Sequence, residues 1–67
     1  MSVARTTEIT ATSPKGFEDA SRKGIERATR TLRNVRSAWI KEQEVVLEGD
    51  AVDHYKVTMK VTFILDD

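Results

Sequence analysis

The residues that could carry acid–base or nucleophilic chemistry are few, and their spacing does not form a catalytic set. His54 is the single histidine, and the chain has no cysteine. A catalytic histidine needs a nucleophile or an orienting carboxylate, and neither a Ser/His/Asp spacing nor a glycine-rich phosphate loop can be read in the sequence. We therefore predict an exposed polar position for His54 and a protein that is not an enzyme.

Trp39, the single tryptophan, could instead hold a planar ligand. An indole ring stacks in offset geometry on a flat ligand or on the same residue of a second copy, but large aromatic side chains also fill packing contacts and interfaces. A cation–π contact with Lys60 is a third interpretation. Lys56 could hold a phosphate or carboxylate as a point charge, or it could be a solvated or ion-paired lysine. The residues alone leave these alternatives open.

Acidic residues gather in the second half of the chain, where they could bind a hard cation such as calcium. Calcium prefers several oxygens around one point, and no spacing here matches an EF-hand loop. We therefore predict no metal site within one chain. Carboxylates from several copies could converge on a symmetry axis, and a solvated acidic surface is the alternative. The residues concerned are Glu42, Glu44, Glu48, Asp50, Asp53, Asp66 and Asp67.

The size and composition of the chain favour self-association. The chain has 67 residues, which we interpret as a single domain over residues 1–67. A domain of this size buries only about 60% of its unfolded surface, and it usually needs a disulfide, a metal or oligomerisation. Because cysteine and a histidine cluster are absent from the sequence, we expect a homo-oligomer.

Charge and hydropathy argue against two kinds of partner. The 11 basic and 11 acidic residues balance, which gives no electrostatic reason to expect nucleic acid. No apolar run approaches the ~20 residues of a membrane span. The first residues also lack the hydrophobic core of a signal peptide. We expect a cytoplasmic protein with neither a nucleic-acid nor a membrane partner.

The first half of the chain predicts a strand followed by a helix. β-Branched residues over 3–11 favour the strand. Ser13 suits the N-cap and Pro14 the first position of a helix over 14–33, which Asn34 would end. Small side chains in the apolar stripe would let this helix lie close to a sheet. The stripe consists of Phe17, Ala20, Gly24, Ala28 and Leu32.

The second half predicts a β-hairpin. Polar and apolar residues alternate over 55–65, and Gly49-Asp50 suits a tight turn between strands over 35–47 and 52–65. This turn predicts an apolar face with the pairs Ala38–Val61, Ile40–Met59 and Arg36–Phe63. It predicts a polar face with the pairs Ser37–Thr62, Trp39–Lys60, Lys41–Thr58 and Gln43–Lys56. A bulge near 44–46 could still change this register.

These lengths leave part of the sheet uncovered. A strand of about 12 residues spans ~40 Å, whereas the helix reaches only ~28 Å. One helix covers one face, so the face that carries Trp39 and the free strand edges are available to partners or ligands.

The strand–helix–strand–strand order and several phrases of the sequence resemble the dodecin family. The phrases are Thr12-Ser13-Pro14, Arg27-Ala28 to Thr31-Leu32, Ile40-Lys41-Glu42, and Tyr55-Lys56-Val57-Thr58-Met59-Lys60-Val61 with Phe63 and Leu65. The resemblance implies an α+β fold in which a three-stranded antiparallel sheet wraps one helix. It also implies a hollow homododecamer that stores or sequesters a flavin, either riboflavin or FMN, without catalysis.

The resemblance also implies an altered ligand pocket. Ser37 stands where flavin-binding dodecins carry the stacking tryptophan, and Lys56 stands where they carry a glutamine. This pattern resembles a branch without that tryptophan, one member of which is described as a calcium dodecin. We predict that the ligand contacts are Ser37, Trp39, Gln43 and Lys56. The alternatives are a flavin-free branch that binds calcium or another small ligand, and a purely structural assembly.

Overall fold

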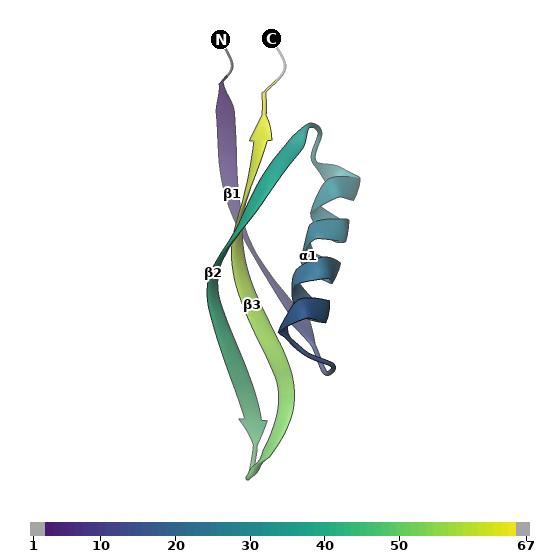
Figure 1. Ribbon diagram of the computed structural model, residues 1–67, viewed down its shortest axis with the longest axis vertical. Helices are drawn as coiled ribbons and strands as arrows, with labels where there is room; N and C mark the ends of the chain where they lie inside the picture. The colour runs from purple at the N-terminus through teal and green to yellow at the C-terminus, as the bar shows by residue number, and fades with distance from the viewer. Residues whose placement is uncertain (1–2, 66–67) are drawn as a thin grey trace.

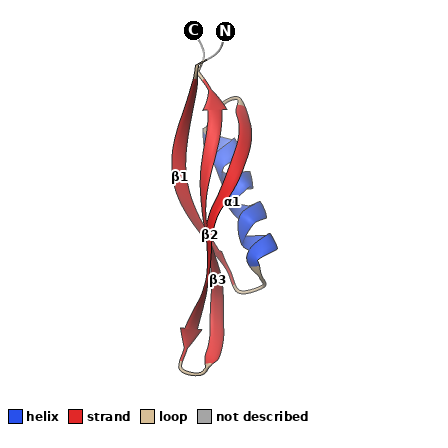
Figure 2. Ribbon diagram, turned by 60° about the vertical axis from the view of Figure 1, so that its left-hand side comes forward, coloured by secondary structure: helices blue, strands red, loops and turns tan. Residues whose placement is uncertain are grey.

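The computed structural model describes residues 3–65 as one sheet and one helix (Figure 1). The elements are β1 (Ala4–Ser13), α1 (Phe17–Thr31), β2 (Val35–Glu48) and β3 (Ala51–Ile64). The strands are antiparallel in the order β1-β3-β2, so β3 is the central strand. Figure 2 shows the twisted sheet with α1 on one of its faces. The predicted α+β fold is confirmed.

The core forms where the small residues of α1 meet β3. Ala20 and Ala28 are buried against the fully buried Val57 and Met59 of the central strand. Gly24 lies between the two alanines, and a Cβ added to it would be 2.7 Å from Met59 Cε. The predicted apolar stripe is therefore confirmed, because only small side chains allow the helix axis to come this close to the sheet.

The start of the helix differs from the prediction. Ser13 is the last residue of β1, and the helix begins at Phe17 with Gly16 as its N-cap. The predicted N-cap at Ser13 and first helical position at Pro14 are wrong. The Ser13 hydroxyl has other partners, since it accepts a hydrogen bond from the Lys15 N–H at 3.0 Å and donates one to Asp19 Oδ2 at 2.5 Å.

The end of the helix also comes earlier than predicted. Thr31 is the last helical residue, and the Leu32 N–H donates to the Ala28 carbonyl at 2.9 Å. Asn34 has a positive φ of 59° in the connection to β2. Asparagine tolerates this left-handed conformation better than most residues, so Asn34 turns the chain into β2.

The β2–β3 register agrees with the prediction only in its middle part. Ser37, Ala38, Trp39 and Ile40 pair as predicted with Thr62, Val61, Lys60 and Met59, respectively. The predicted Arg36–Phe63 pair is wrong, because the register shifts at Arg36 and Val35 faces Phe63. A second shift at Lys41 pairs Glu42 with Thr58, Gln43 with Val57 and Glu44 with Lys56. The predicted pairs Lys41–Thr58 and Gln43–Lys56 are therefore wrong as well.

A third shift restores the predicted turn. It lies between Val46 and Leu47, after which Leu47 faces Val52 and Glu48 faces Ala51. Gly49 has a φ of 63°, which suits the first central position of a two-residue hairpin turn. Bulges increase the twist of a strand pair, and these three lie in the hairpin that curves past α1 in Figure 1.

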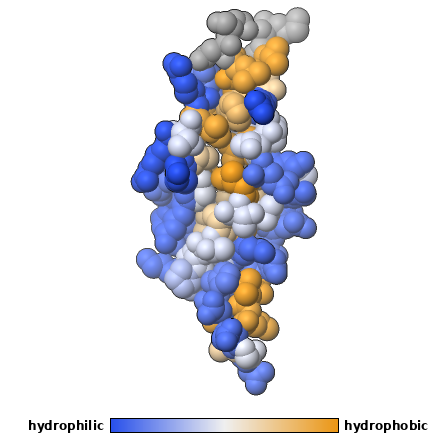
Figure 3. Space-filling view, turned by 180° about the vertical axis from the view of Figure 1, so that it is seen from behind, coloured by the Kyte–Doolittle hydropathy of each residue, from blue (hydrophilic) through white to orange (hydrophobic). Residues whose placement is uncertain are grey.

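The end of this hairpin extends beyond the helix, as the strand and helix lengths predict (Figure 1). Val45, Leu47 and Val52 are exposed there by 42%, 58% and 52%. Figure 3 shows apolar surface near this end of the molecule. Part of the hairpin thus presents apolar side chains that no other element of the described chain covers.

Candidate functional site

Trp39 lies in the open on the face of the sheet turned away from α1, which we call the outer face. Its partner Lys60 stands between Met59 and Val61, whose side chains are buried toward the helix. Because successive side chains alternate along a strand, Lys60 and Trp39 point the other way. Trp39 is 61% exposed, so it does not pack in the core of its own chain.

Lys60 contacts the Trp39 ring, which agrees with the cation–π interpretation. The Lys60 Nζ lies 5.8 Å from the ring centroid. This distance is within the range at which a cation is attracted to an indole face, with about 0.5–1 kcal/mol at an exposed site. The pair thus combines a flat aromatic surface with a positive charge over the ring. It can stack a planar ligand and attract a negative group on it.

Two of the other predicted site residues share the outer face with Trp39. Ser37 faces Thr62, two residues along β2 from Trp39, and it is exposed. Lys56 faces Glu44, and its Nζ lies 3.2 Å from Glu44 Oε1. Lys56 is therefore ion-paired in the single chain, which agrees with one of its two predicted alternatives.

Gln43 is not brought together with the other three. It faces Val57, whose side chain is fully buried toward α1, so the Gln43 position belongs to the helix side of the sheet. The extra residue at Lys41 causes this change of face. Glu42 and Glu44 take the outer-face positions instead. The predicted register did not bring either of them to this face, because the polar run from Lys41 to Glu44 contains no apolar alternation that would locate a bulge.

Polar cross-strand pairs surround Trp39 and tie the three strands together. Thr6 and Thr62 hydroxyls are 3.2 Å apart, and those of Thr10 and Thr58 are 3.5 Å apart. Lys41 Nζ lies 3.3 Å from Glu8 Oε1, a contact that joins β2 to β1 across the central strand. The outer face is thus a polar platform with one large exposed aromatic ring.

His54 forms a local pair rather than part of a site with Trp39. Its Nδ1 lies 2.7 Å from Oδ2 of the neighbouring Asp53. Within residues 3–65, no three His, Asp or Glu side chains are close enough together to hold a metal ion. Asp66 and Asp67 lie outside the described residues. In the part of the chain described, no helix combines the length and the apolar character that a membrane crossing requires.

Asp19 is the one described carboxylate with a strongly perturbed pKa. It is 8% exposed and lies in the first turn of α1. The hydrogen bond from the Ser13 hydroxyl, followed by that from the Arg22 guanidinium at 2.8 Å, holds the pKa of Asp19 well below its ordinary value of 3.8. Lys23 Nζ contributes from 3.2 Å. The cluster joins the end of β1 to the start of α1, and this structural task accounts for the shift.

The described residues form a small β-α-β-β fold with an exposed indole on its sheet, and such a surface is typical of ligand-binding modules. Comparison with known proteins agrees with that class, since a family model for dodecins matches residues 3–66. The chain belongs to the dodecin family, whose members are non-catalytic ligand-binding proteins. The prediction that the protein is not an enzyme is confirmed.

Individual relatives cover nearly the whole chain. The structure is similar to that of dodecin from Streptomyces davaonensis, with a TM-score of 0.92 and 41% identity over 98% of this chain and 97% of that one. It is also similar to the tt0972 protein from Thermus thermophilus, with a TM-score of 0.91 and 30% identity over 100% and 98% of the two chains. The sequence is 29% identical over 63 residues to a protein named calcium dodecin from Mycobacterium tuberculosis, covering 94% of this chain and 89% of that one.

These comparisons support membership of the dodecin family, but they do not support the expectation that the chain belongs to a particular branch of it. Flavin-binding dodecamers are typical of the family, and the calcium dodecin is a distant relative. The expected assignment to a branch without the stacking tryptophan is unsupported, because this chain has an exposed tryptophan, Trp39, on the outer face.

Proposed function

We propose that this chain is the subunit of a hollow homododecamer that binds a flavin-like ligand on Trp39 and stores or sequesters it. The observation that carries this proposal is the 61% exposure of Trp39 on a polar sheet face. An indole of this size is normally buried or placed at an interface or ligand site. Family membership gives the ligand class, since flavin binding is typical of dodecins.

The flat geometry of the outer face supports a site shared between copies. Ligand sites usually bury about 70–90% of the ligand surface. A ring stacked on Trp39 of one subunit has its other side exposed, because the outer face carries only strands in the described chain. A second subunit that presents the same face would cover that side. The proposed ligand site is therefore incomplete in one copy and complete in the assembly.

The proposed contacts have distinct roles. Trp39 stacks on the planar ring, and Ser37 lies beside it on the same strand face. Lys56 and Lys60 both lie along β3, and because Lys56 is ion-paired with Glu44, it is the charge of Lys60 that suits a ligand with a phosphate or another anionic group. Gln43 is left out of the proposed site because its position belongs to the opposite face.

Fluorescence titration tests this proposal directly, since Trp39 is the single tryptophan. We expect riboflavin or FMN to quench Trp39 emission in the assembled protein. Stacking on an aromatic side chain contributes about 1–3 kcal/mol, so Trp39→Ala should weaken binding by roughly 5- to 150-fold when flavin fluorescence is followed. Trp39→Phe is the matched control, because it keeps a smaller ring and should lose less affinity. A titration with no quenching by either flavin would rule out the flavin site.

Calcium binding is the alternative that the named relative supports. Calorimetry with calcium chloride alone separates it from flavin binding. Heat of binding with calcium and none with flavin would favour a cation site formed between copies. No binding of either, together with an intact assembly, would favour a purely structural shell.

A further inference from the structure

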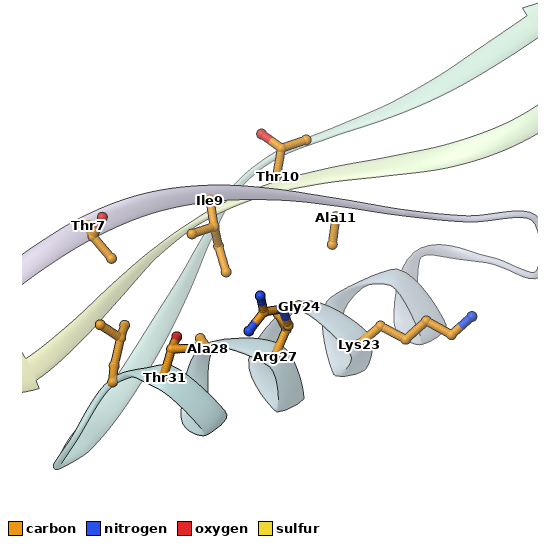
Figure 4. Close-up of a pocket in the computed structure, with 10 residues that line it drawn as sticks. Thr7, Ile9, Thr10, Ala11, Lys23, Gly24, Arg27, Ala28 and Thr31 are labelled. Atoms are coloured by element: carbon orange, nitrogen blue, oxygen red, sulfur yellow. The ribbon is translucent and has the colours of Figure 1, made fainter.

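A groove between β1 and α1 combines an apolar floor with a positively charged rim. Its volume is about 490 Å³. Figure 4 shows the β1 and α1 side chains that line it, with Arg27 extending from the helix toward β1. Among the described residues, no ion pair is found for Arg27, whereas Lys23 contacts Asp19 at 3.2 Å. The floor consists of Ile9, Ala11, Ala28 and Leu32.

The end of the β2–β3 hairpin has the opposite character. We call residues 45–52 the hairpin tip. Its apolar side chains Val45, Leu47 and Val52 are exposed by 42%, 58% and 52%. Residues 45–52 contain two carboxylates, Glu48 and Asp50, and no lysine or arginine. Within residues 3–65, no ion pair is found for Glu48 or Asp50.

The tip cannot reach the groove of its own subunit. β3 runs as one strand from Ala51 to Ile64, and it carries the tip beyond the end of α1 (Figure 1). The groove lies alongside α1 on the β1 edge of the sheet, whereas the tip belongs to β2 and β3. Residues 3–65 thus present an acidic apolar projection and a basic apolar recess that lie apart from each other in one chain.

We propose that the hairpin tip of one copy packs in the β1/α1 groove of a second copy. The proposal rests on the assembly of identical copies in the proposed function and specifies the contact that joins them. Exposed apolar side chains of the tip meet the floor of the groove, while Glu48 and Asp50 approach the rim at Arg27. Opposite charges on the two surfaces fix the register of such a contact and exclude the like-charged pairings of tip with tip or groove with groove. The contact is head-to-tail, so it builds a ring of copies when the rotation from one copy to the next closes.

A charge exchange tests the contact. Arg27→Glu replaces a positive charge of the groove rim by a negative one, and Glu48→Lys replaces a negative charge of the tip by a positive one. In sedimentation velocity at micromolar concentration, the dissociation constant of the assembly should be at least tenfold higher for each single variant than for the parent protein. The double variant, Arg27→Glu with Glu48→Lys, exchanges the two charges and should recover most of the parent assembly. Arg30→Glu is the matched control, because Arg30 is on the same helix but outside the groove, and it should leave the assembly intact.

The outcomes separate this contact from its rivals. Recovery in the double variant supports the proposal even if a single variant is poorly folded by circular dichroism. If the tip packs against another tip, only Glu48→Lys should change the mass of the assembly. If the groove instead holds an anionic small molecule, Arg27→Glu should leave that mass unchanged. Either result overturns the proposal, as does a double variant that is no better assembled than both singles. The parent protein could also be a large assembly that binds flavin while each variant has the same assembly mass as the parent. This result would refute the tip–groove contact and would leave the proposed function standing.

Discussion

Gly24 lies where α1 closely approaches the sheet, and its replacement by alanine tests how tightly that contact is packed. Alanine is more favourable than glycine in a helix interior by about 0.8–1.0 kcal/mol. A Cβ at this position, however, would lie 2.7 Å from Met59 Cε and 3.1 Å from Ala11 Cβ. Helix propensity and core packing therefore predict opposite signs for the change in stability.

The outcome depends on whether the two neighbours can move. Met59 Cε is the end of a flexible side chain, but Met59 is fully buried, and leaving its rotamer minimum costs about 0.5–1.5 kcal/mol. Ala11 Cβ is fixed to β1, so the strand itself must shift. Inserting a methyl group into a packed core costs about 1–3 kcal/mol in all. We expect packing to outweigh propensity, with Gly24→Ala lowering the free energy of unfolding by about 1 kcal/mol.

Urea unfolding followed by circular dichroism measures this change. The protein concentration must be held fixed, because the stability of an assembly depends on it. Thr29→Ala, at an exposed position of the same helix, is the control for propensity and should be neutral or slightly stabilising. Met59→Ala should cost about 2–5 kcal/mol by itself. In that background the 2.7 Å contact is gone and the 3.1 Å contact with Ala11 Cβ remains, so Gly24→Ala should become nearly neutral, with a coupling of about 1 kcal/mol.

The reasoning about Gly24 fails under either of two results. In the first, Gly24→Ala raises the free energy of unfolding of the parent protein, which would mean that β1 and Met59 move aside at little cost. The other is the same effect of Gly24→Ala with and without Met59, which would mean that the two positions are not in contact.

Two further variants, one single and one double, test the Asp19 cluster and the outer face. Because the folded-state pKa of Asp19 is depressed, its contribution to stability is present above its ordinary pKa of 3.8 and is lost as the pH falls below that value. Asp19→Asn should therefore lower the melting temperature near neutral pH, and the difference from the parent should shrink between about pH 5 and pH 2, whereas a constant difference would contradict this account. Ser37→Trp with Lys56→Gln introduces the two side chains that the sequence resemblance implies for these positions, and one added stacking contact should tighten flavin binding by roughly 5- to 150-fold. Unchanged or weaker affinity, measured by flavin fluorescence, would show that the two positions do not line the ligand site.

Much of the fold could be predicted because local and long-range signals agree. The alternation over 55–65 identifies β3, and the buried Val57, Met59 and Val61 are its apolar members. Gly49 locates the hairpin turn, since only a glycine readily adopts its positive φ there. The small residues Ala20 and Gly24 indicate the close approach of α1. Each of these features depends on residues near one another in sequence.

The helix start could not be predicted in the same way. Ser13-Pro14 satisfies the local rules for an N-cap followed by a first helical residue. In the structure, Ser13 pairs with Tyr55 across the sheet, and its hydroxyl is bonded to Asp19. A strand partner more than forty residues away in sequence decides the outcome. Capping rules do not include such a partner, so they place the helix start too early.

The composition of the outer face depends on a single register shift in β2. One extra residue at Lys41 moves Gln43 to the helix side and brings Glu42 and Glu44 to the side of Trp39. Glu44 then pairs with Lys56, so one of the two cations next to the proposed ligand position is already neutralised. The positive charge that remains for an anionic group is that of Lys60, which lies against the indole itself. A bulge in β2, rather than the choice of residues in the strand, thus determines which charges a ligand stacked on Trp39 would meet.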